Sequence, residues 1–170
     1  AELRDTTADG SKDKAMIEKT GYSDWYSWAV DNWGTKWEVC EFYGVDRNHL
    51  NDSLDESTIS FSFDSAWSPP IGAYEQFLVD NENCALVARY YEGGCDFMGI
   101  WDNGDDRCYQ PSNYKSDDKF FDNGDGKEID DYFGITESMA EWEAEQESEA
   151  EVKVRELVVE KKAVNIGEDV

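Results

Sequence analysis

The chain is poor in cationic residues, histidine and proline. It has 15 Lys and Arg against 40 Asp and Glu, one His and three Pro in 170 residues, with a formal net charge of −25. This balance opposes direct binding to nucleic-acid phosphates and to anionic membranes. The single histidine, His49, excludes metal sites with two or more histidine ligands. Its acidic surroundings favour a solvated loop residue over a member of a catalytic triad.

Long apolar runs and paired cysteines are also missing. No stretch approaches the ~20 apolar residues of a membrane span, and no signal peptide is visible. None of the four cysteines lies in a C-x-x-C pair, which disfavours a zinc ribbon or a thioredoxin-like site. A chain of this length does not need disulfides, so we expect reduced, mostly buried thiols. They are Cys40, Cys84, Cys95 and Cys108.

Motifs for phosphate, calcium or catalysis are lacking as well. Neither G-x-x-x-x-G-K-[ST] nor G-x-G-x-x-G occurs. The acidic segment 122–131 departs from the EF-hand loop because Gly124 stands where that loop needs Asp or Asn. A solvated turn is favoured there over a weak cation site. We therefore expect no metal, no cofactor and no enzymatic activity, with a small hydrolase or nuclease as the least favoured alternative.

Aromatic residues, in contrast, are plentiful. Seven Trp, nine Tyr and eight Phe indicate a folded body under an acidic surface, rather than a disordered acidic chain. The carboxylates themselves fit three interpretations. They serve solubility, adapt the protein to salty surroundings, or attract a basic partner, which includes mimicry of a nucleic-acid backbone.

Local patterns in the first half of the chain predict two helices and two strands. A helix is expected at 23–33, capped by Ser23 and ended by Gly34. A strand at 35–43 and an acidic loop at 44–57 follow. Residues 58–64 form the clearest strand, with Ile59, Phe61 and Phe63 on one face. A second helix is capped by Ser68, with Pro69 and Pro70 in its first turn, and ends near Asp80.

The second half predicts a strand at 84–92 and a hairpin at 97–109. Asn103-Gly104 favours the turn that matches strand twist. Residues 121–125 echo 101–105, which suggests a second, similar turn. An acidic amphipathic helix is expected at 136–150. Its continuation to 163 stays open, because the valines of 152–159 fit a strand equally well.

Two aromatic motifs and a glycine-bounded strand carry a family resemblance. Residues 32–37 read NWGTKW, and 65–70 read SAWSPP, with Ser65 where the family has threonine. Residues 90–93 read YYEG and are followed by FMG at 97–99. Over about residues 20–102 the chain resembles the YubB-type ferredoxin-like domain, a family of uncharacterised phage and plasmid proteins. The resemblance implies a fold and a viral or mobile-element setting. It implies no reaction.

The resemblance implies that the first strand of that family is missing from this chain. We expect its place to be taken by the 97–110 hairpin, by the valine-rich segment 152–159, or by a strand from another chain. The fold expected is α+β, with a ferredoxin-like mixed or antiparallel sheet, two packed helices and a C-terminal acidic helix. The domains expected are a polar segment at 1–20, the ferredoxin-like domain at 21–134 and an acidic, partly helical tail at 135–170.

Candidate binding residues fall into an aromatic group and an acidic group. For the aromatic group, packing of a helix on a strand is the more conservative interpretation, and Lys36 is expected to be solvated rather than to lie over a ring. The acidic group supplies long-range attraction. The aromatic group is Trp33, Lys36, Trp37, Trp67, Pro69, Pro70 and Tyr91, and the acidic group is Glu141, Glu145 and Glu149.

These features together predict an accessory protein of a phage or mobile element that acts by protein binding. Its partner would be a basic protein surface of host or phage in the host cytoplasm. The options include inhibition of, or mimicry for, a nucleic-acid-binding partner. The alternative is a structural virion component that makes subunit contacts. An open sheet edge would also permit self-association.

Overall fold

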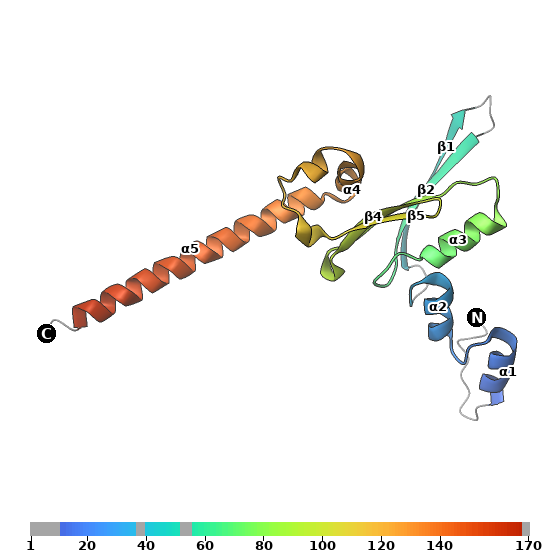
Figure 1. Ribbon diagram of the computed structural model, residues 1–170, viewed down its shortest axis with the longest axis horizontal. Coiled ribbons are helices and arrows are strands. Elements are labelled where there is room, and N and C mark those ends of the chain that lie inside the picture. The colour runs from blue at the N-terminus through green and yellow to red at the C-terminus, as the bar shows by residue number, and fades with distance from the viewer. Residues whose placement is uncertain (1–10, 37–39, 52–55, 168–170) are drawn as a thin grey trace. The chain divides into compact units, whose positions relative to one another are not determined.

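The computed structural model describes residues 11–36, 40–51 and 56–167 (Figure 1). Over these residues the protein is mixed α+β with two small antiparallel sheets, which confirms the predicted fold class. The chain divides into two compact units. The first contains the described residues up to Ala88 together with Trp101–Asp105, and the second contains Arg89–Ile100 and the residues from Asp106 onward.

The first sheet is a hairpin of β1 (Cys40–Asn51) and β2 (Glu56–Asp64). The second has the order β3-β4-β5, with β3 at Val87–Glu92, β4 at Phe97–Asp102 and β5 at Asp105–Tyr109. The ferredoxin-like arrangement stays a prediction, because the described strands pair as two sheets.

Three helices belong to the first unit: α1 (Ser11–Thr20), α2 (Trp25–Trp33) and α3 (Ile71–Asp80). The predicted end of α2 is correct, since Gly34 adopts a left-handed φ of 79°. The predicted cap is wrong by one residue. Asp24 caps α2, accepting a 2.8 Å bond from the Ser27 amide, while the Ser23 hydroxyl bonds to Asp24.

The hairpin is longer than its local pattern indicates. The prediction of a loop at 44–57 is wrong over 44–51, where β1 continues, and over 56–57, where β2 begins; His49 pairs with Ser57. Polar residues form a strand there because β2 offers a backbone partner. Residues 37–39, within the predicted first strand, and 52–55 lie outside the described residues.

The second aromatic helix also starts later than predicted. α3 begins at Ile71 with Pro70 as its cap residue. Ser68 does not cap it, because the Ser68 hydroxyl donates to the Gly34 carbonyl. The predicted end at Asp80 is correct.

The β4–β5 turn is formed as predicted. Asn103 and Gly104 have positive φ values of 48° and 100°, as a type I′ hairpin turn requires. The expected second turn at 121–125 is wrong. Gly124 opens α4 (Gly124–Phe133), a helix where the sequence favours a solvated turn.

A hydrophobic cluster holds the second unit together. Met98 and Ile100 of β4 pack with Phe121, Ile129 and Ile135, and Ile129 and Ile135 are fully buried. Ile129 lies on α4 and Ile135 begins α5 (Ile135–Gly167). The core therefore ties β4 to α4 and to the first turn of α5.

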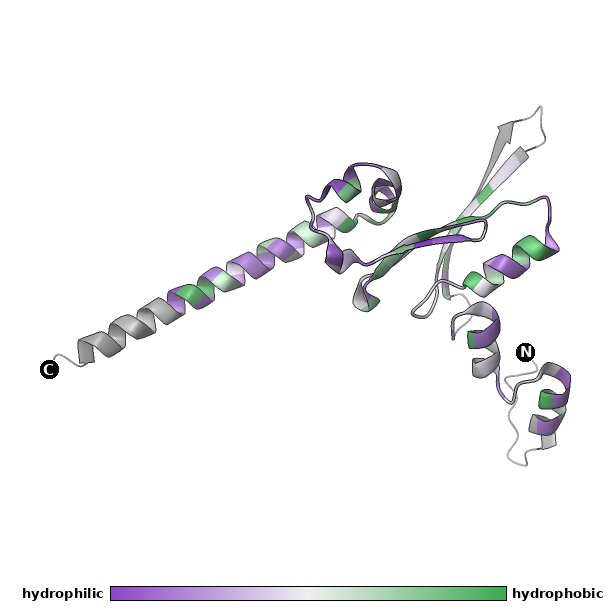
Figure 2. Ribbon diagram, in the orientation of Figure 1, coloured by the Kyte–Doolittle hydropathy of each residue, from purple (hydrophilic) through white to green (hydrophobic). Residues whose placement is uncertain are grey.

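Helix α5 resolves the open question about the valine-rich segment, because 152–159 is helical. That segment is not a strand beside β2, and the 97–110 hairpin pairs with β3. Figure 2 shows mostly hydrophilic residues along the coloured part of α5 beyond its first turns. Every side chain from Ala144 to Glu156 is exposed. No described helix has both the length and the apolarity of a membrane span.

The expectation of mostly buried thiols is wrong. All four cysteines are exposed, and no disulfide joins them. Larger apolar side chains fill the core positions instead, among them Trp101 at 1% exposure.

The core predicts a clear asymmetry between two helical positions. Ile129→Ala should lower the free energy of unfolding by about 2–5 kcal/mol, because it leaves a cavity between β4 and α4. Val79→Ala on α3, where the side chain is 70% exposed, should change it by less than about 0.5 kcal/mol. Denaturant unfolding followed by circular dichroism measures both. Equal effects would contradict this description of the core.

Candidate binding surfaces

Two segments of the first unit, 34–36 and 65–70, are held together by side-chain hydroxyls. The Thr35 hydroxyl donates to the Ala66 carbonyl at 2.8 Å, and the Ser68 hydroxyl donates to the Gly34 carbonyl at 2.5 Å. Thr35 and Ala66 are 4% and 6% exposed. A buried carbonyl without a donor is costly, so the Thr35 bond is a strong constraint. We call these two bonds the hydroxyl latch.

Helices α2 and α3 approach closely beside the latch. A Cβ atom on Gly72 would lie 2.4 Å from the carbonyl oxygen of Asn32, so no side chain fits at this position. The Pro69 carbonyl accepts a 2.9 Å bond from the Ile71 amide at the start of α3. The end of α2 and the start of α3 thus fix the segment between β2 and α3.

Trp67 stands out in this fixed segment. Its φ is +62°, a left-handed conformation that is rare for a bulky residue and costs on the order of 1–3 kcal/mol. The Ser65 hydroxyl closes the turn around it by donating to the Ser68 carbonyl at 2.6 Å. Ala66 and Pro70 are buried, whereas Trp67 is 64% exposed. The strained turn therefore holds a large aromatic side chain in solvent.

Lys36 lies over this indole. Its Nζ atom is 3.1 Å from the centroid of the Trp67 ring. The expectation of a solvated lysine is therefore wrong, because the latch brings 34–36 beside Trp67. A cation–π contact at an exposed site contributes about 0.5–1 kcal/mol. Two residues from the two sequence motifs thus form one surface, which we call the Trp67 platform.

The other residues of the predicted aromatic group make packing contacts or lie outside the residues that the structure describes. Trp33 is half-buried and lies edge-to-face on Trp28, with ring centroids 5.1 Å apart. Tyr91 belongs to the second unit, 5.8 Å from the ring of Phe133. Trp37 lies outside the described residues.

The predicted acidic residues share one face of α5. Glu141, Glu145 and Glu149 are spaced by four positions, which aligns side chains along a helix, and all three are exposed. From 137 to 151 the helix has seven glutamates and no cationic residue. Attractive pairs follow further along, between Glu149 and Lys153 and between Glu151 and Arg155.

Repulsion among these glutamates destabilises helix α5. Each like-charge pair four positions apart costs roughly 0.2–0.5 kcal/mol. Nothing described packs on the side chains beyond Glu143 to offset this cost. A basic surface laid along this face would remove the repulsion. The like-charge pairs are 137–141, 141–145, 143–147, 145–149 and 147–151.

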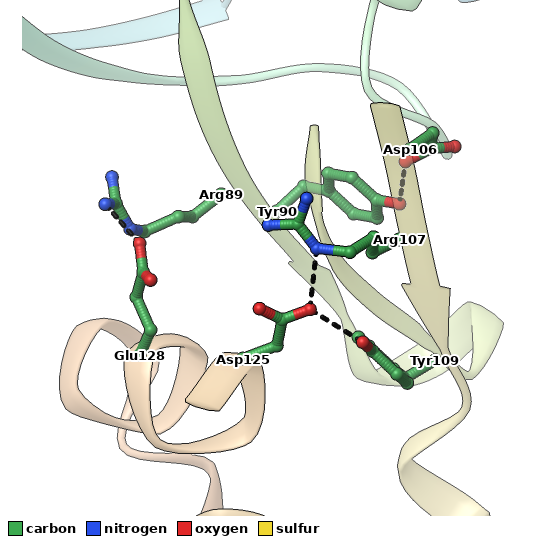
Figure 3. A network of polar contacts seen from close by, with 7 residues as sticks. All are labelled: Arg89, Tyr90, Asp106, Arg107, Tyr109, Asp125 and Glu128. Atoms are coloured by element: carbon green, nitrogen blue, oxygen red, sulfur yellow. Dashed lines mark hydrogen bonds and ion pairs between the residues drawn. The ribbon is translucent and has the colours of Figure 1, made fainter. Parts of the chain in front are cut away.

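A polar network joins β5 to α4 in the second unit (Figure 3). The Asp125 carboxylate accepts 2.7 Å bonds from both Arg107 Nε and the Tyr109 hydroxyl. These bonds, first that from Tyr109, lower the pKa of Asp125. The bond to Asp125 in turn raises the pKa of Tyr109 to about 12. Asp125 is thus held ionised and Tyr109 protonated at neutral pH.

Strand β3 of the same sheet makes two more polar contacts. The Tyr90 hydroxyl donates to Asp106 at 2.6 Å, and burial together with this bond raises the pKa of Tyr90. Arg89 pairs with Glu128. Protonated tyrosines are donors rather than bases, so this network has the character of a structural clamp. Within the described residues, no group of three or more His, Cys, Asp and Glu side chains is placed to hold a metal ion.

Sequence reasoning missed the latch and the clamp for one reason. Their partners lie between 16 and 34 positions apart, and a single sequence has no periodic signal for such contacts. The recurrence of Ser and Thr inside the aromatic motifs was the available indication. No protein-family model, curated protein or solved structure matches the chain.

The latch predicts that the hydroxyl at position 35 matters more than the methyl group. Thr35→Val should lower the free energy of unfolding by about 1–3 kcal/mol, since the buried Ala66 carbonyl loses its donor. Thr35→Ser keeps the donor and should cost clearly less. Denaturant unfolding compares the two variants, and equal losses would contradict the role of the latch.

The clamp predicts a shift in the titration of Tyr109. Asp125→Asn should move the pKa of Tyr109 from about 12 toward the ordinary value of about 10, because the carboxylate no longer favours the protonated phenol. Tyrosinate absorbance titrations, each compared with the same background carrying Tyr109→Phe, isolate this residue. Asp122→Asn is the control.

The lowered pKa of Asp125 also fixes a direction for stability. Its contribution is present above the unfolded value near 3.9 and is lost as the pH falls through the lower folded value. Asp125→Asn should therefore make stability less sensitive to acid in that range. An unchanged Tyr109 titration together with an unchanged acid profile would show that the clamp is absent in solution.

Proposed function

We propose that this chain is a non-catalytic protein that binds a basic protein surface through α5 and the Trp67 platform. The observation that carries the proposal is the glutamate face of α5, formed by the exposed residues Glu141, Glu145 and Glu149, in a stretch from 137 to 151 that has seven glutamates and no cation. Such a concentration of one sign raises the encounter rate with a basic partner and falls off with salt.

The Trp67 platform supports the proposal from the first unit. Tryptophan is among the residues that contribute most to protein interfaces, because it buries a large rigid area. The strained turn already holds Trp67 exposed before a partner binds. Binding therefore costs little conformational entropy at this side chain. The platform and the glutamate face then have separate roles, one in contact area and one in attraction.

The setting of this binding is part of the proposal. The resemblance to phage and plasmid proteins supports a phage or mobile-element accessory protein with a ferredoxin-like body, active in the host cytoplasm. The partner would be a host or phage protein whose basic surface serves nucleic-acid binding. The row of carboxylates on α5 then competes as a mimic of a phosphate backbone.

The test is salt-dependent binding to the partner that the immobilised full chain captures from expressing cells and that mass spectrometry identifies. With that partner purified, Glu141→Gln combined with Glu145→Gln and Glu149→Gln should weaken binding roughly tenfold at low salt, since three exposed ion pairs contribute about 0.5 kcal/mol each. The salt dependence of the affinity should also become shallower.

Two matched controls separate charge from position. Glu75→Gln, Asp80→Asn and Glu82→Gln remove three exposed carboxylates from the first unit and should change the affinity by less than about twofold. Trp67→Ala should weaken binding without changing its salt dependence, whereas Phe77→Ala at another exposed aromatic should not. The proposal would be contradicted by an affinity that does not change with ionic strength. It would also be contradicted if the α5 variant and the first-unit variant lost the same amount of affinity.

A further inference from the structure

The hairpin of the first unit has one apolar face. Ile59, Phe61 and Phe63 alternate along β2 and therefore share a face. Phe42 of β1 stacks on Phe61 with centroids 5.3 Å apart, and Phe61 lies 6.1 Å from Phe63. These four residues are called the aromatic strip.

The aromatic strip is largely uncovered. Phe42, Ile59 and Phe61 are 56%, 56% and 53% exposed. A two-stranded hairpin is at best marginally stable in water, and a third strand or a covering layer is what normally stabilises it. The strip is thus a surface whose burial would stabilise the element that carries it.

The two edges of the hairpin differ in regularity. Between the pairs Cys40↔Asp64 and Tyr43↔Ser62, β1 advances three residues while β2 advances two, and the same irregularity recurs before the pair Asp46↔Ser60. A third shift follows between His49 and Asn51. In each case the extra residue lies on β1.

Bulges of this kind twist an edge away from further pairing. Glu41 and Gly44, inside the bulged stretch, have positive φ values of 46° and 50°. β2 advances without an extra residue from Glu56 to Asp64. Within the described residues β2 pairs with β1 alone, so the backbone groups on its outer side are available to another strand. β2 is thus the receptive edge and β1 the protected one.

Charge decides what can occupy this edge. The described side chains of the hairpin, at 40–46 and 57–64, include the exposed carboxylates Glu41, Asp46 and Asp64 and no cationic group. A second copy of the chain would bring carboxylates against carboxylates. A strand with lysine or arginine at its ends would pair with them.

We propose that β2 is a docking edge for an extended segment of a basic partner protein, which adds as a strand and covers the aromatic strip with its alternate apolar side chains. Main-chain hydrogen bonds supply affinity in this mode, and the alternating side chains supply specificity. The inference deepens the proposed function by naming the binding mode, and it rests on that function for the basic character of the partner.

The test uses the full chain and synthetic peptides as long as β2, with valine and threonine alternating and two lysines at each end. The lysine-ended peptide should bind and slow amide hydrogen exchange at 57–64. A peptide with glutamates at the ends should bind roughly tenfold more weakly or worse. N-methylation of alternate peptide amides on the pairing edge should abolish binding, because that edge loses its donors.

Two substitutions test the face that is covered. Phe61→Ser should weaken binding of the lysine-ended peptide roughly tenfold. Tyr43→Ser is the matched control, since Tyr43 is 52% exposed but pairs with Ser62 and bonds to Asp64 on the opposite face. The N-methylated peptide keeps the test valid even if a substitution disturbs the hairpin.

Three results would overturn the docking edge. One is equal binding of the plain and N-methylated peptides, and another is exchange protection outside 57–64. The third is a dimer, seen by sedimentation without peptide and dissolved by Phe61→Ser, which would assign the edge to a second copy. The Glu141, Glu145 and Glu149 variant should bind the peptide as the unaltered chain does. A failed peptide test with intact salt-dependent partner binding therefore rejects the docking edge and leaves the proposed function standing.

Discussion

Carboxylates outnumber cationic groups so heavily in this chain that most of them cannot form one-to-one ion pairs. In the folded body, several carboxylates accept hydrogen bonds from hydroxyls and backbone amides instead. Asp96 accepts from both the amide and the hydroxyl of Ser112, and Glu143 accepts from the hydroxyl and amide of Ser116. These bonds lower the pKa of both carboxyls. Each pair also ties a loop to its neighbour, so the same donors that keep the acids ionised also hold the chain in place.

Three cations in the body connect separate segments of the chain. Arg107 and Arg89 reach from the second sheet to carboxylates on α4, and Lys36 lies on Trp67. From Ile135 to Val152, α5 has no cation of its own. On the exposed part of the helix, the ion pairs of Glu149 with Lys153 and of Glu151 with Arg155 therefore fall at the end of the glutamate-rich stretch, which keeps a large excess of negative charge. This excess of glutamates on α5 is the part of the charge distribution that is available for binding a partner.

Local patterns in the sequence were sufficient where a local rule decides the structure. The alternation at 58–64 located β2, Asn103-Gly104 located the β4–β5 turn, and Gly34 ended α2. They failed where the outcome depends on a distant partner. Nothing near 44–51 indicates a strand, because that strand exists by pairing with β2. Of the candidate site, the sequence identified Trp67 and Lys36 but not their contact, which depends on a hydroxyl bond spanning 31 positions.

The exposed aromatic surfaces and the excess charge are best understood together. An uncovered strip of Phe and Ile on a regular strand edge normally invites association between copies of a chain. Bulges protect one edge of the hairpin, but β2 has no such protection. Electrostatic repulsion protects β2 from pairing with a second copy, because every approaching copy carries the same net charge of −25. A basic partner meets no such barrier. The carboxylates therefore do more than attract: by repelling copies of the chain, they allow it to keep apolar surface exposed for a partner of opposite charge.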